Sequence, residues 1–321
     1  MITVINLLFI LNDLSIACKQ LCCNSRAGEI MNYRQVKDKI ILKDINSFNI
    51  EQILECGQCF RFYKISEGHY LIIAKAKVLK ILQTDEEVIF YPATIEDFKN
   101  LWISYFDLNR DYDIIKQRLA EKDQYLNKAI DYAPGIRILN QDPWECLISF
   151  IISQNKQIPH IKQVVNHISR RFGQYIDTVD NIDYFAFPTA EELSKAKEED
   201  LRACKAGFRA PYILDACKKI KSGEIDLEKL KYLPYEEAKT TLLNIKGVGP
   251  KIADCVLLFA FGKWEAFPVD IWIKRIMESL YFNREISLNE IGHFAREQFG
   301  NYAGLAQQYL FYYGRQLKIG K

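Results

Sequence analysis

The sequence predicts an α+β fold in which a small N-terminal antiparallel sheet domain packs on an all-helical body with a helix-hairpin-helix motif. Three observations support this prediction. Between about residues 31 and 95, apolar and polar residues alternate with the period of two that is typical of half-buried strands. From about residue 95 onward, apolar residues recur at helical spacing. Near residue 247, a glycine-rich turn separates two apolar helical segments.

We divide the chain into three parts. Residues 1–30 are an extension whose apolar run is too short to span a bilayer and has no preceding Lys or Arg, unlike a secretory signal. We interpret it as a non-functional extension from a misplaced start codon, with a membrane or partner helix as the alternative. Residues 31–133 form the sheet domain with its helices. Residues 134–321 form the helical body, which begins where Pro134-Gly135 breaks the chain.

The individual elements follow from the same periodicities. Strands are expected at 60–65, 69–83 and 87–92. Helices are expected at 98–108 and 112–123, and then at 144–155, 161–173, 190–197, 211–223 and 235–245. The hairpin and two more helices complete a part that is expected to be helical to its end.

The composition is that of a soluble globular protein with a sizeable core, at 49% hydrophobic and 26% charged residues. A net charge of +2 excludes a chain-wide basic surface, so any DNA-binding face must arise locally. The stretch 244–275 is such a locally basic segment.

The nine cysteines are scattered, odd in number and follow no secretory signal, which indicates a reducing compartment. Cys56 and Cys59 have the spacing of half a zinc site, but no second pair follows, so buried thiols are the favoured interpretation. We expect no metal ion. The expected location is the cytoplasm, at the nucleoid of a prokaryote, or the nucleus of a eukaryote.

The stretch 242–270 organises the predicted body. An apolar run ends at Ile245, and a second apolar helical segment follows a turn. Glycines permit a tight turn, and a proline suits the first turn of a helix. The turn therefore exposes backbone N–H groups and a helix N-terminus, which together suit a DNA phosphate. The residues placed against the DNA backbone are Lys246, Gly247, Val248 and Gly249.

Two residues near the hairpin suggest covalent chemistry. Lys251 lies in the first turn of the second helix, where the macrodipole disfavours a cation and so favours the nucleophilic free amine. Asp270 is placed to N-cap the next helix. Together they suit attack on a sugar carbon, with the carboxylate stabilising the positive charge that grows as a base departs. Taken singly, Lys251 is a phosphate partner and Asp270 a helix cap.

With these residues in view, the chain resembles the helix-hairpin-helix DNA glycosylases, and more closely the 8-oxoguanine DNA glycosylases with lyase activity. The resemblance covers about residues 50–320. It implies an enzyme that flips 8-oxoguanine out of double-stranded DNA, with Lys251 and Asp270 as catalytic residues and no cofactor. A related subclass carries a four-cysteine iron–sulfur loop after the catalytic Asp. No cysteine follows Cys255, so no iron–sulfur cluster is expected.

The resemblance also assigns residues that would recognise the lesion. The segment 56–62 is similar to the family motif whose glycine, here Gly57, offers its carbonyl to the N7 hydrogen that only oxidised guanine carries. Cys255 and Phe311 would sandwich the flipped base, Gln307 would read its Watson–Crick edge, and Pro268 would lie with them. Without the resemblance, Gly57 is a tight strand turn and Phe311 belongs to the core.

Further motifs resemble the parts of the family that hold the DNA open. Asn155 matches the asparagine that fills the gap left by the flipped base. Phe208 matches the wedge beside the opposite base, and Arg209 the arginine that bonds it. From pattern alone, Asn155 ends a helix and Phe208 is core, although its Gly and Pro neighbours indicate an exposed loop.

Three positions depart from the family. The arginine that helps to read an opposite cytosine is His160 here. The usual histidine two residues after the catalytic Asp is Trp272, and its aspartate partner is Gly314. The missing bidentate contact predicts a loss of about 1–3 kcal/mol in discrimination for cytosine opposite the lesion.

We therefore predict a monomeric, bifunctional glycosylase that excises 8-oxoguanine and cuts the strand 3′ of the abasic site. Two alternatives remain open. One is a glycosylase of the same superfamily for another damaged base, and the other is a non-enzymatic helix-hairpin-helix module that only binds DNA.

Overall fold

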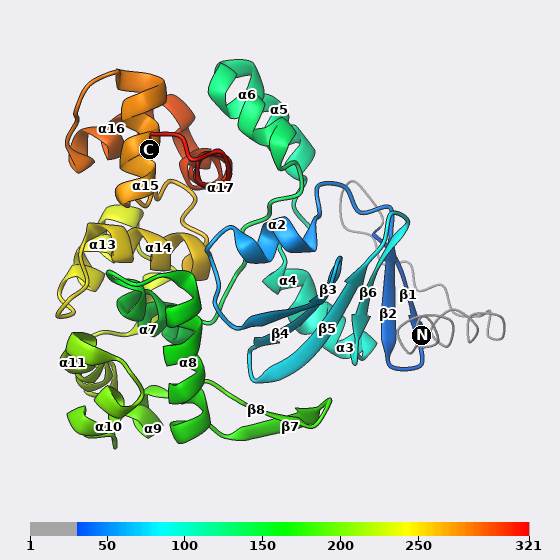
Figure 1. The fold of residues 1–321 in the computed structure, drawn as a ribbon, viewed down its shortest axis with the longest axis vertical. Helices are drawn as coiled ribbons and strands as arrows, with labels where there is room; N and C mark the ends of the chain where they lie inside the picture. The colour runs from blue at the N-terminus through cyan, green and yellow to red at the C-terminus, as the bar shows by residue number, and fades with distance from the viewer. Residues whose placement is uncertain (1–30, 321) are drawn as a thin grey trace.

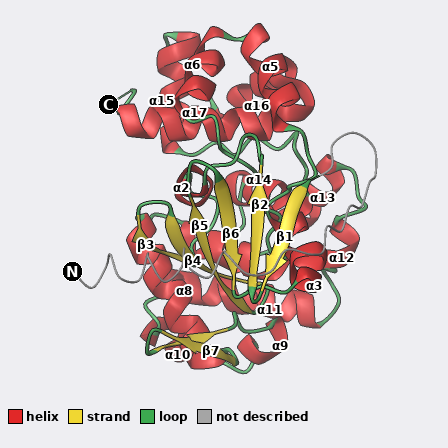
Figure 2. Ribbon diagram, turned by 90° about the vertical axis from the view of Figure 1, so that its right-hand side faces the viewer, coloured by secondary structure: helices red, strands yellow, loops and turns green. Residues whose placement is uncertain are grey.

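The structure is a computed structural model that describes residues 31–320. The expected extension at residues 1–30 lies outside the described residues. Figure 1 shows a sheet domain on one side of the molecule and a helical body on the other, which confirms the predicted α+β class. Figure 2 views the sheet face-on, with helices α5, α6 and α15–α17 above it and strand β7 below. None of the helices in residues 31–320 combines the length and the apolar character that crossing a bilayer requires.

The main sheet is antiparallel, with the strand order β1-β2-β6-β5-β4-β3. Its strands are β1 (Asn32–Val36), β2 (Lys39–Lys43), β3 (Phe62–Ser66), β4 (His69–Ala74), β5 (Lys77–Gln83) and β6 (Glu87–Tyr91). The single strand expected at 69–83 is wrong, because a tight turn divides it into β4 and β5. Lys75 and Ala76 form this turn with φ values of 52° and 57°. Neither residue is a usual turn former, so the alternation passes through the turn without interruption.

One face of the sheet packs against a short helical segment to form the smaller of the two main cores. The helices of this domain are α2 (Ile50–Glu55), α3 (Ile95–Asp97), the π-helical η2 (Phe98–Trp102) and α4 (Ile103–Tyr105). The ring of Phe90 in the sheet meets Phe98 and Phe106 edge-on, with centroids 5.4 and 5.6 Å apart. These aromatic contacts hold the helical segment on the sheet.

The larger core lies in the helical body, and α5 and α6 belong to it. Tyr112, Leu119 and Leu126 from these two helices are buried in that core. Leu108 belongs to the smaller core and Tyr112 to the larger one, so α5 and α6 pack with the helical body although they precede the boundary predicted at residue 133. That boundary stays a prediction. The helices of the body are α5 (Tyr112–Lys122), α6 (Gln124–Tyr132), α7 (Pro143–Ser153), α8 (Ile158–Phe172), α9 (Ala190–Leu193), α10 (Glu198–Ala203), η3 (Gly207–Arg209), α11 (Ala210–Lys221), α12 (Leu227–Leu230), α13 (Tyr235–Leu243), α14 (Pro250–Phe261), α15 (Ile271–Met277), η4 (Glu278–Phe282), α16 (Leu288–Phe299), η5 (Gly300–Tyr302) and α17 (Ala303–Leu317).

The body also contains a β-hairpin, so the expectation of helices alone after residue 134 was incomplete. Its strands are β7 (Tyr175–Val179) and β8 (Ile182–Phe185). The hairpin reaches back to the sheet domain (Figure 1), where Lys80 Nζ lies 2.9 Å from Asp180 Oδ2 and the Tyr63 and Tyr184 rings meet edge-on. The β7–β8 hairpin of the helical body therefore contacts the sheet domain directly.

Arg137 is the main polar link between the two cores. Its buried guanidinium donates hydrogen bonds to the carbonyls of Ser47 (2.8 Å), Asp107 (2.7 Å) and Asn46 (3.0 Å). The guanidinium carbon lies 4.4 Å from the centre of the Tyr112 ring. One side chain thus satisfies three carbonyls of the sheet domain while stacking on the first helix of the larger core.

We predict that Arg137→Met lowers the free energy of unfolding by about 2–3 kcal/mol, because three carbonyls lose the donor that a buried guanidinium supplies. Chemical denaturation measures this loss. Arg202→Met is the control, because Arg202 only pairs with Glu198 on an exposed helix face and its loss should leave stability nearly unchanged. Similar losses in both variants would refute the role of Arg137 as a link.

Candidate active site

The hairpin between α13 and α14 is held by close packing against α11. Gly247 has a φ of +81°, and a Cβ added there would lie 2.3 Å from the Tyr212 ring. The backbone N–H of Lys246 donates a 2.7 Å hydrogen bond to Asp215 Oδ2, also on α11. Glycine at 247 therefore serves both the left-handed conformation and the approach of an aromatic ring.

The start of α14 is open to an anion. Its N-cap is Gly249, which has no side chain to satisfy the first N–H groups of the helix. Val248 is buried beneath the turn, whereas Lys246 is exposed beside it. The hairpin therefore presents N–H groups and a lysine together, as a phosphate-binding turn requires.

Lys251 and Asp270 both act electrostatically on the thiol of Cys255, which lies one helical turn after Lys251 on α14. Burial raises the pKa of Cys255 to about 12, while the neighbouring Lys251, which also hydrogen-bonds to the thiol, lowers it in part. The carboxylates of Asp254 and Asp270 act on the same thiol and raise its pKa. Lys251 is partly exposed, and its Nζ lies 5.0 Å from the centre of the Phe150 ring. A lysine and a thiol are therefore in contact near the start of α14, and a carboxylate lies within electrostatic reach of the thiol.

Asp270 has the capping role that its position predicted. Its Oδ1 accepts a 2.8 Å hydrogen bond from the Ile273 N–H at the start of α15. This bond orients the carboxylate, and the side chain remains partly exposed. The cap and a role in chemistry are therefore compatible, because the capped carboxylate remains partly exposed.

Gly57 lies on a loop of the sheet domain that contacts helix α17 of the helical body. It follows α2 with a φ of +85°, and a Cβ added there would lie 3.2 Å from Cε1 of Phe311 on α17. The neighbouring Gln58 holds the loop in position, because its buried amide donates to the carbonyls of Ile53 (2.9 Å) and Arg137 (2.8 Å). The loop and the aromatic ring thus form one wall made from both domains.

Gln307 lies on α17, one helical turn before Phe311, and contacts Pro268. The Gln307 side chain is 4% exposed, and its Nε2 donates a 3.2 Å hydrogen bond to the Pro268 carbonyl. Its Oε1 accepts a 2.6 Å bond from Gln308 Nε2. Gln307 is therefore buried and already bonded, and it would have to exchange a partner to read a base.

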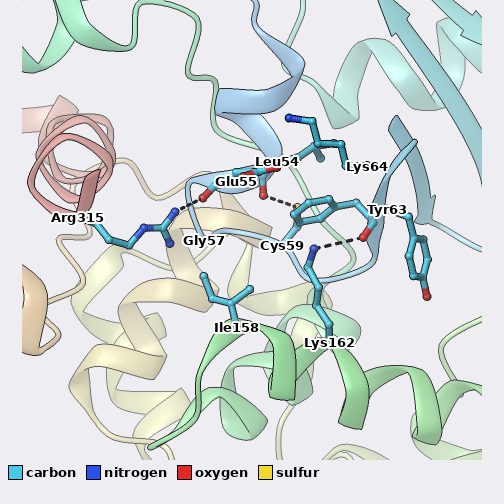
Figure 3. A pocket seen from close by; sticks show the side chains of 10 residues that line it. Leu54, Glu55, Gly57, Cys59, Tyr63, Lys64, Ile158, Lys162 and Arg315 are labelled. Carbon is cyan, nitrogen blue, oxygen red and sulfur yellow. Dashed lines mark hydrogen bonds between the residues drawn. The ribbon is translucent and has the colours of Figure 1, made fainter. Parts of the chain in front are cut away.

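A cavity of about 360 Å³ lies between the Gly57 loop and α8. Its lining includes Gly57, Phe62, Tyr63, Ile158, Lys162 and Arg315. Figure 3 shows Gly57 between Arg315 on one side and Cys59 on the other, with Ile158 and Lys162 reaching up from α8. The space is large enough to receive part of a nucleotide beside the glycine.

The residues expected to hold the DNA open form a second group on two neighbouring loops. Phe208 is 46% exposed at the tip of η3, and Asn155 is exposed after α7 with a φ of 49°. Arg209 joins the two loops, because its Nε donates a 2.9 Å hydrogen bond to the Gln154 carbonyl. At 4% exposure, Arg209 is turned into the protein, whereas His160 is exposed at the start of α8.

This second group is locally cationic. Burial lowers the pKa of Lys156, and the charges of Arg209 and Lys205 lower it further. Three cations therefore lie close enough to repel one another beside Phe208 and Asn155. A polyanion lying across these loops would relieve that repulsion.

The departure at Gly314 has a packing explanation. A Cβ at this position would lie 2.3 Å from Cδ1 of Ile276 on α15. The Ile276 side chain therefore occupies the space where the family resemblance expects an aspartate. The histidine that this aspartate would partner is Trp272, so the two replacements occur together.

The Cys56 and Cys59 thiols are buried and free, as expected. Burial raises the pKa of Cys56 to about 12, so this thiol stays protonated. In residues 31–320, no three His, Cys, Asp or Glu side chains are grouped as a metal site would require.

Sequence reasoning missed the residues that support the site. Gln58 lay within the quoted 56–62 motif, and its position next to an essential glycine was a usable signal. Tyr212, Asp215 and Arg315 carried no such signal, because their contacts join elements that are distant along the chain.

Two protein-family profiles match this chain. The profile of the 8-oxoguanine DNA glycosylase N-terminal domain matches residues 40–147, and that of the HhH-GPD superfamily of base excision DNA repair proteins matches residues 148–298. The chain belongs to the 8-oxoguanine DNA glycosylase family. Together, the two matches cover every element that contributes Gly57, Lys251, Cys255 or Asp270.

Individual members of this family are similar over about half of the chain or more. A probable N-glycosylase/DNA lyase of Methanothermobacter thermautotrophicus is 35% identical over 231 residues, 66% of this chain and 73% of the relative. The N-glycosylase/DNA lyase of Saccharomyces cerevisiae is 40% identical over 167 residues, 49% of this chain and 44% of the relative. The Clostridium acetobutylicum 8-oxoguanine glycosylase/lyase, solved with double-stranded DNA containing cytosine opposite 8-oxoguanine, superposes with a TM-score of 0.87 at 44% identity. That alignment covers 91% of this chain and 99% of the clostridial chain.

We predict that Gly247→Ala lowers the free energy of unfolding by about 1–3 kcal/mol, because the new Cβ is strained and overlaps the Tyr212 ring. Gly249→Ala in the same hairpin is the matched control, since its φ is −98° and nothing lies within 4 Å of the added Cβ. Denaturant titration of both variants measures the difference. Equal stability of the two would show that the hairpin does not depend on this packing.

Proposed function

We propose that this protein is a bifunctional DNA glycosylase that excises 8-oxoguanine from double-stranded DNA and then cuts the strand by β-elimination. The observation that carries the proposal is the contact of Lys251 with Cys255 near the start of the hairpin helix, within electrostatic reach of Asp270, in a chain of this family. The clostridial relative, solved with a lesion duplex, supports DNA as the substrate. A module that only binds DNA has no need of this grouping.

In the first step, the Lys251 amine attacks C1′ of the flipped nucleotide. A bond forms between Nζ and C1′ as the bond from C1′ to the base breaks, and the bonding electrons leave with the base. Positive charge grows on the sugar during this step, and the Asp270 carboxylate stabilises it. The departing base takes up a proton, and the amine loses one.

In the second step, the sugar ring opens to a Schiff base between Nζ and C1′. This cation acidifies the hydrogens on C2′, and one of them is removed as a proton. The resulting electron pair forms a C2′–C3′ double bond and expels the 3′ phosphate. The strand is thus cut 3′ of the abasic site, and the electrons balance within the substrate.

Recognition of the lesion would rest on Gly57. Its carbonyl would accept a hydrogen bond from the N7 hydrogen of 8-oxoguanine, whereas N7 of guanine carries no hydrogen and would repel the carbonyl. Phe311 beside the loop and Cys255 on α14 would stack on the two faces of the base, with Gln307 and Pro268 at its edge. The contact between Gly57 and Phe311 supports this placement.

The exposed loops would hold the duplex open. Phe208 would insert beside the opposite base, and Asn155 would fill the gap left by the flipped nucleotide. Arg209 would have to leave the Gln154 carbonyl to reach the opposite base. With His160 in place of an arginine, we infer a weakened preference for cytosine.

The protein would act as a monomer, because one chain supplies Gly57, Lys251, Asp270 and Phe208. We further infer that it carries no iron–sulfur cluster, because no cysteine follows Cys255. Its proposed location is the cytoplasm at the nucleoid, or the nucleus in a eukaryote, where its DNA substrate lies.

We predict that Lys251→Gln abolishes both base release and strand cutting and leaves DNA binding within about twofold, because only the nucleophile is lost. Borohydride trapping on 8-oxoguanine duplexes measures the Schiff base. The neighbouring Lys246→Gln should bind DNA more weakly yet still give the trapped adduct at saturating DNA. A trapped adduct in Lys251→Gln would assign the nucleophile to another residue, and wild-type protein active only on another damaged base would overturn the assigned substrate.

We predict that Asp270→Asn lowers the single-turnover rate by about 10²–10³-fold, because the charge is lost while asparagine can still cap the helix. Thermal unfolding should be nearly unchanged. Asp226→Asn is the control, since Asp226 caps α12 in the same way, away from Lys251. Full activity of Asp270→Asn would reduce this residue to a cap.

A further inference from the structure

Arg315 joins the helical body to the loop that carries Gly57. It lies on α17, one helical turn after Phe311, and its Nη2 donates a 2.6 Å hydrogen bond to the Glu55 carbonyl at the end of α2. The guanidinium carbon lies 5.3 Å from the centre of the Phe311 ring. Figure 3 shows the side chain reaching across to the loop, with this bond drawn as a dashed line.

The loop, the ring and the guanidinium touch one another. A Cβ on Gly57 would lie 3.2 Å from the Phe311 ring and 3.9 Å from Nη1 of Arg315. On its inner side, the loop is held by Gln58, whose amide lies in the core, and by Gln141, which bonds the Gln58 carbonyl at 2.6 Å. Arg315 is the hydrogen-bonding side chain that meets the loop from the cavity side.

We propose that Arg315 is a positioning residue for lesion recognition, which holds the Gly57 carbonyl and the Phe311 ring in the relative position that accepts 8-oxoguanine. This inference rests on the proposed function. A single hydrogen-bond acceptor separates the lesion from guanine, so a small displacement of the loop costs discrimination before it affects folding. Arginine suits the task because its planar group stacks on a ring and donates in its own plane at the same time, which lysine does not do.

The chemistry at the sugar provides an internal reference. Cutting DNA at a preformed abasic site uses Lys251 and Asp270 but involves no base to recognise. A residue that acts through Gly57 and Phe311 should therefore affect 8-oxoguanine excision and leave abasic-site cutting alone. A residue that supports the fold or Lys251 should affect both reactions equally.

The test compares single-turnover rates on 8-oxoguanine duplexes and on abasic-site duplexes. For Arg315→Met we expect excision to fall by about tenfold or more and abasic-site cutting to change by less than about twofold. Arg284→Met is the matched control, because Arg284 also lies near a phenylalanine ring and pairs with Glu290 but does not line this cavity, so both of its rates should stay near wild type. Unchanged excision in Arg315→Met, or equal loss of both reactions, would overturn the proposal.

Arg315→Lys separates position from charge and carries the test if Arg315→Met fails to fold. It keeps the positive charge without the stacked planar donor, so we expect it to lose most of the excision rate as well. Full excision by Arg315→Lys would show that charge alone suffices and would overturn the positioning role. Failure of the proposed function is distinguishable, because the wild-type protein itself would then neither excise 8-oxoguanine nor form a trapped adduct.

Discussion

The buried amide of Gln58 is the interaction on which the proposed site depends. It bonds the end of α2 and the segment before α7, so it ties a loop of the sheet domain to the start of the helical body. The Leu139 N–H completes the set by donating a 2.8 Å bond to Gln58 Oε1. Because these groups are all buried, breaking any one of them would leave an unsatisfied polar atom in the core. The position of the Gly57 loop relative to the start of the helical body is therefore determined by buried hydrogen bonds to distant segments and not by the loop itself.

The proposed catalytic residues lie at the starts of helices, whereas the residues proposed to contact the opposite strand lie on short loops. Lys251 and Asp270 stand at the starts of two helices, where the backbone fixes their direction. The residues proposed to face the opposite strand lie on short loops, and Arg209 already bonds a protein carbonyl there. The chemistry thus sits on secondary structure, while the contacts that must adapt to DNA sit where the backbone can move at lower cost.

Much of the fold and of the candidate site could be predicted from the sequence, because it depends on interactions between residues that are close together in the chain. The hairpin glycines, Pro250 at the start of a helix, and Asp270 as a cap each depend on neighbours within a few residues. The division of 69–83 into two strands was missed because Lys75 and Ala76 take a turn conformation that their types do not signal. The β7–β8 hairpin was missed for a related reason, since Asp180 and Asn181 were not recognised as its turn.

The remaining features depend on contacts between distant segments, which a single sequence does not display. The inward orientation of Arg209 depends on a carbonyl that lies more than fifty residues earlier. The contacts of Arg315 depend on the docking of α17 against α2. Motif resemblance supplied the identities of Gly57, Gln307 and Phe311, and their roles in the reaction stay predictions.

The burial of the cysteines in the described part of the chain, residues 31–320, has a consequence for their reactivity toward oxidants. Oxidised guanine accumulates when peroxide and related oxidants are present, and these oxidants attack thiolates far faster than thiols. Burial raises the pKa of Cys56 and Cys255 to about 12 and that of Cys146 well above its usual value. These three thiols therefore stay in the protonated form, which reacts more slowly with such oxidants than the thiolate does.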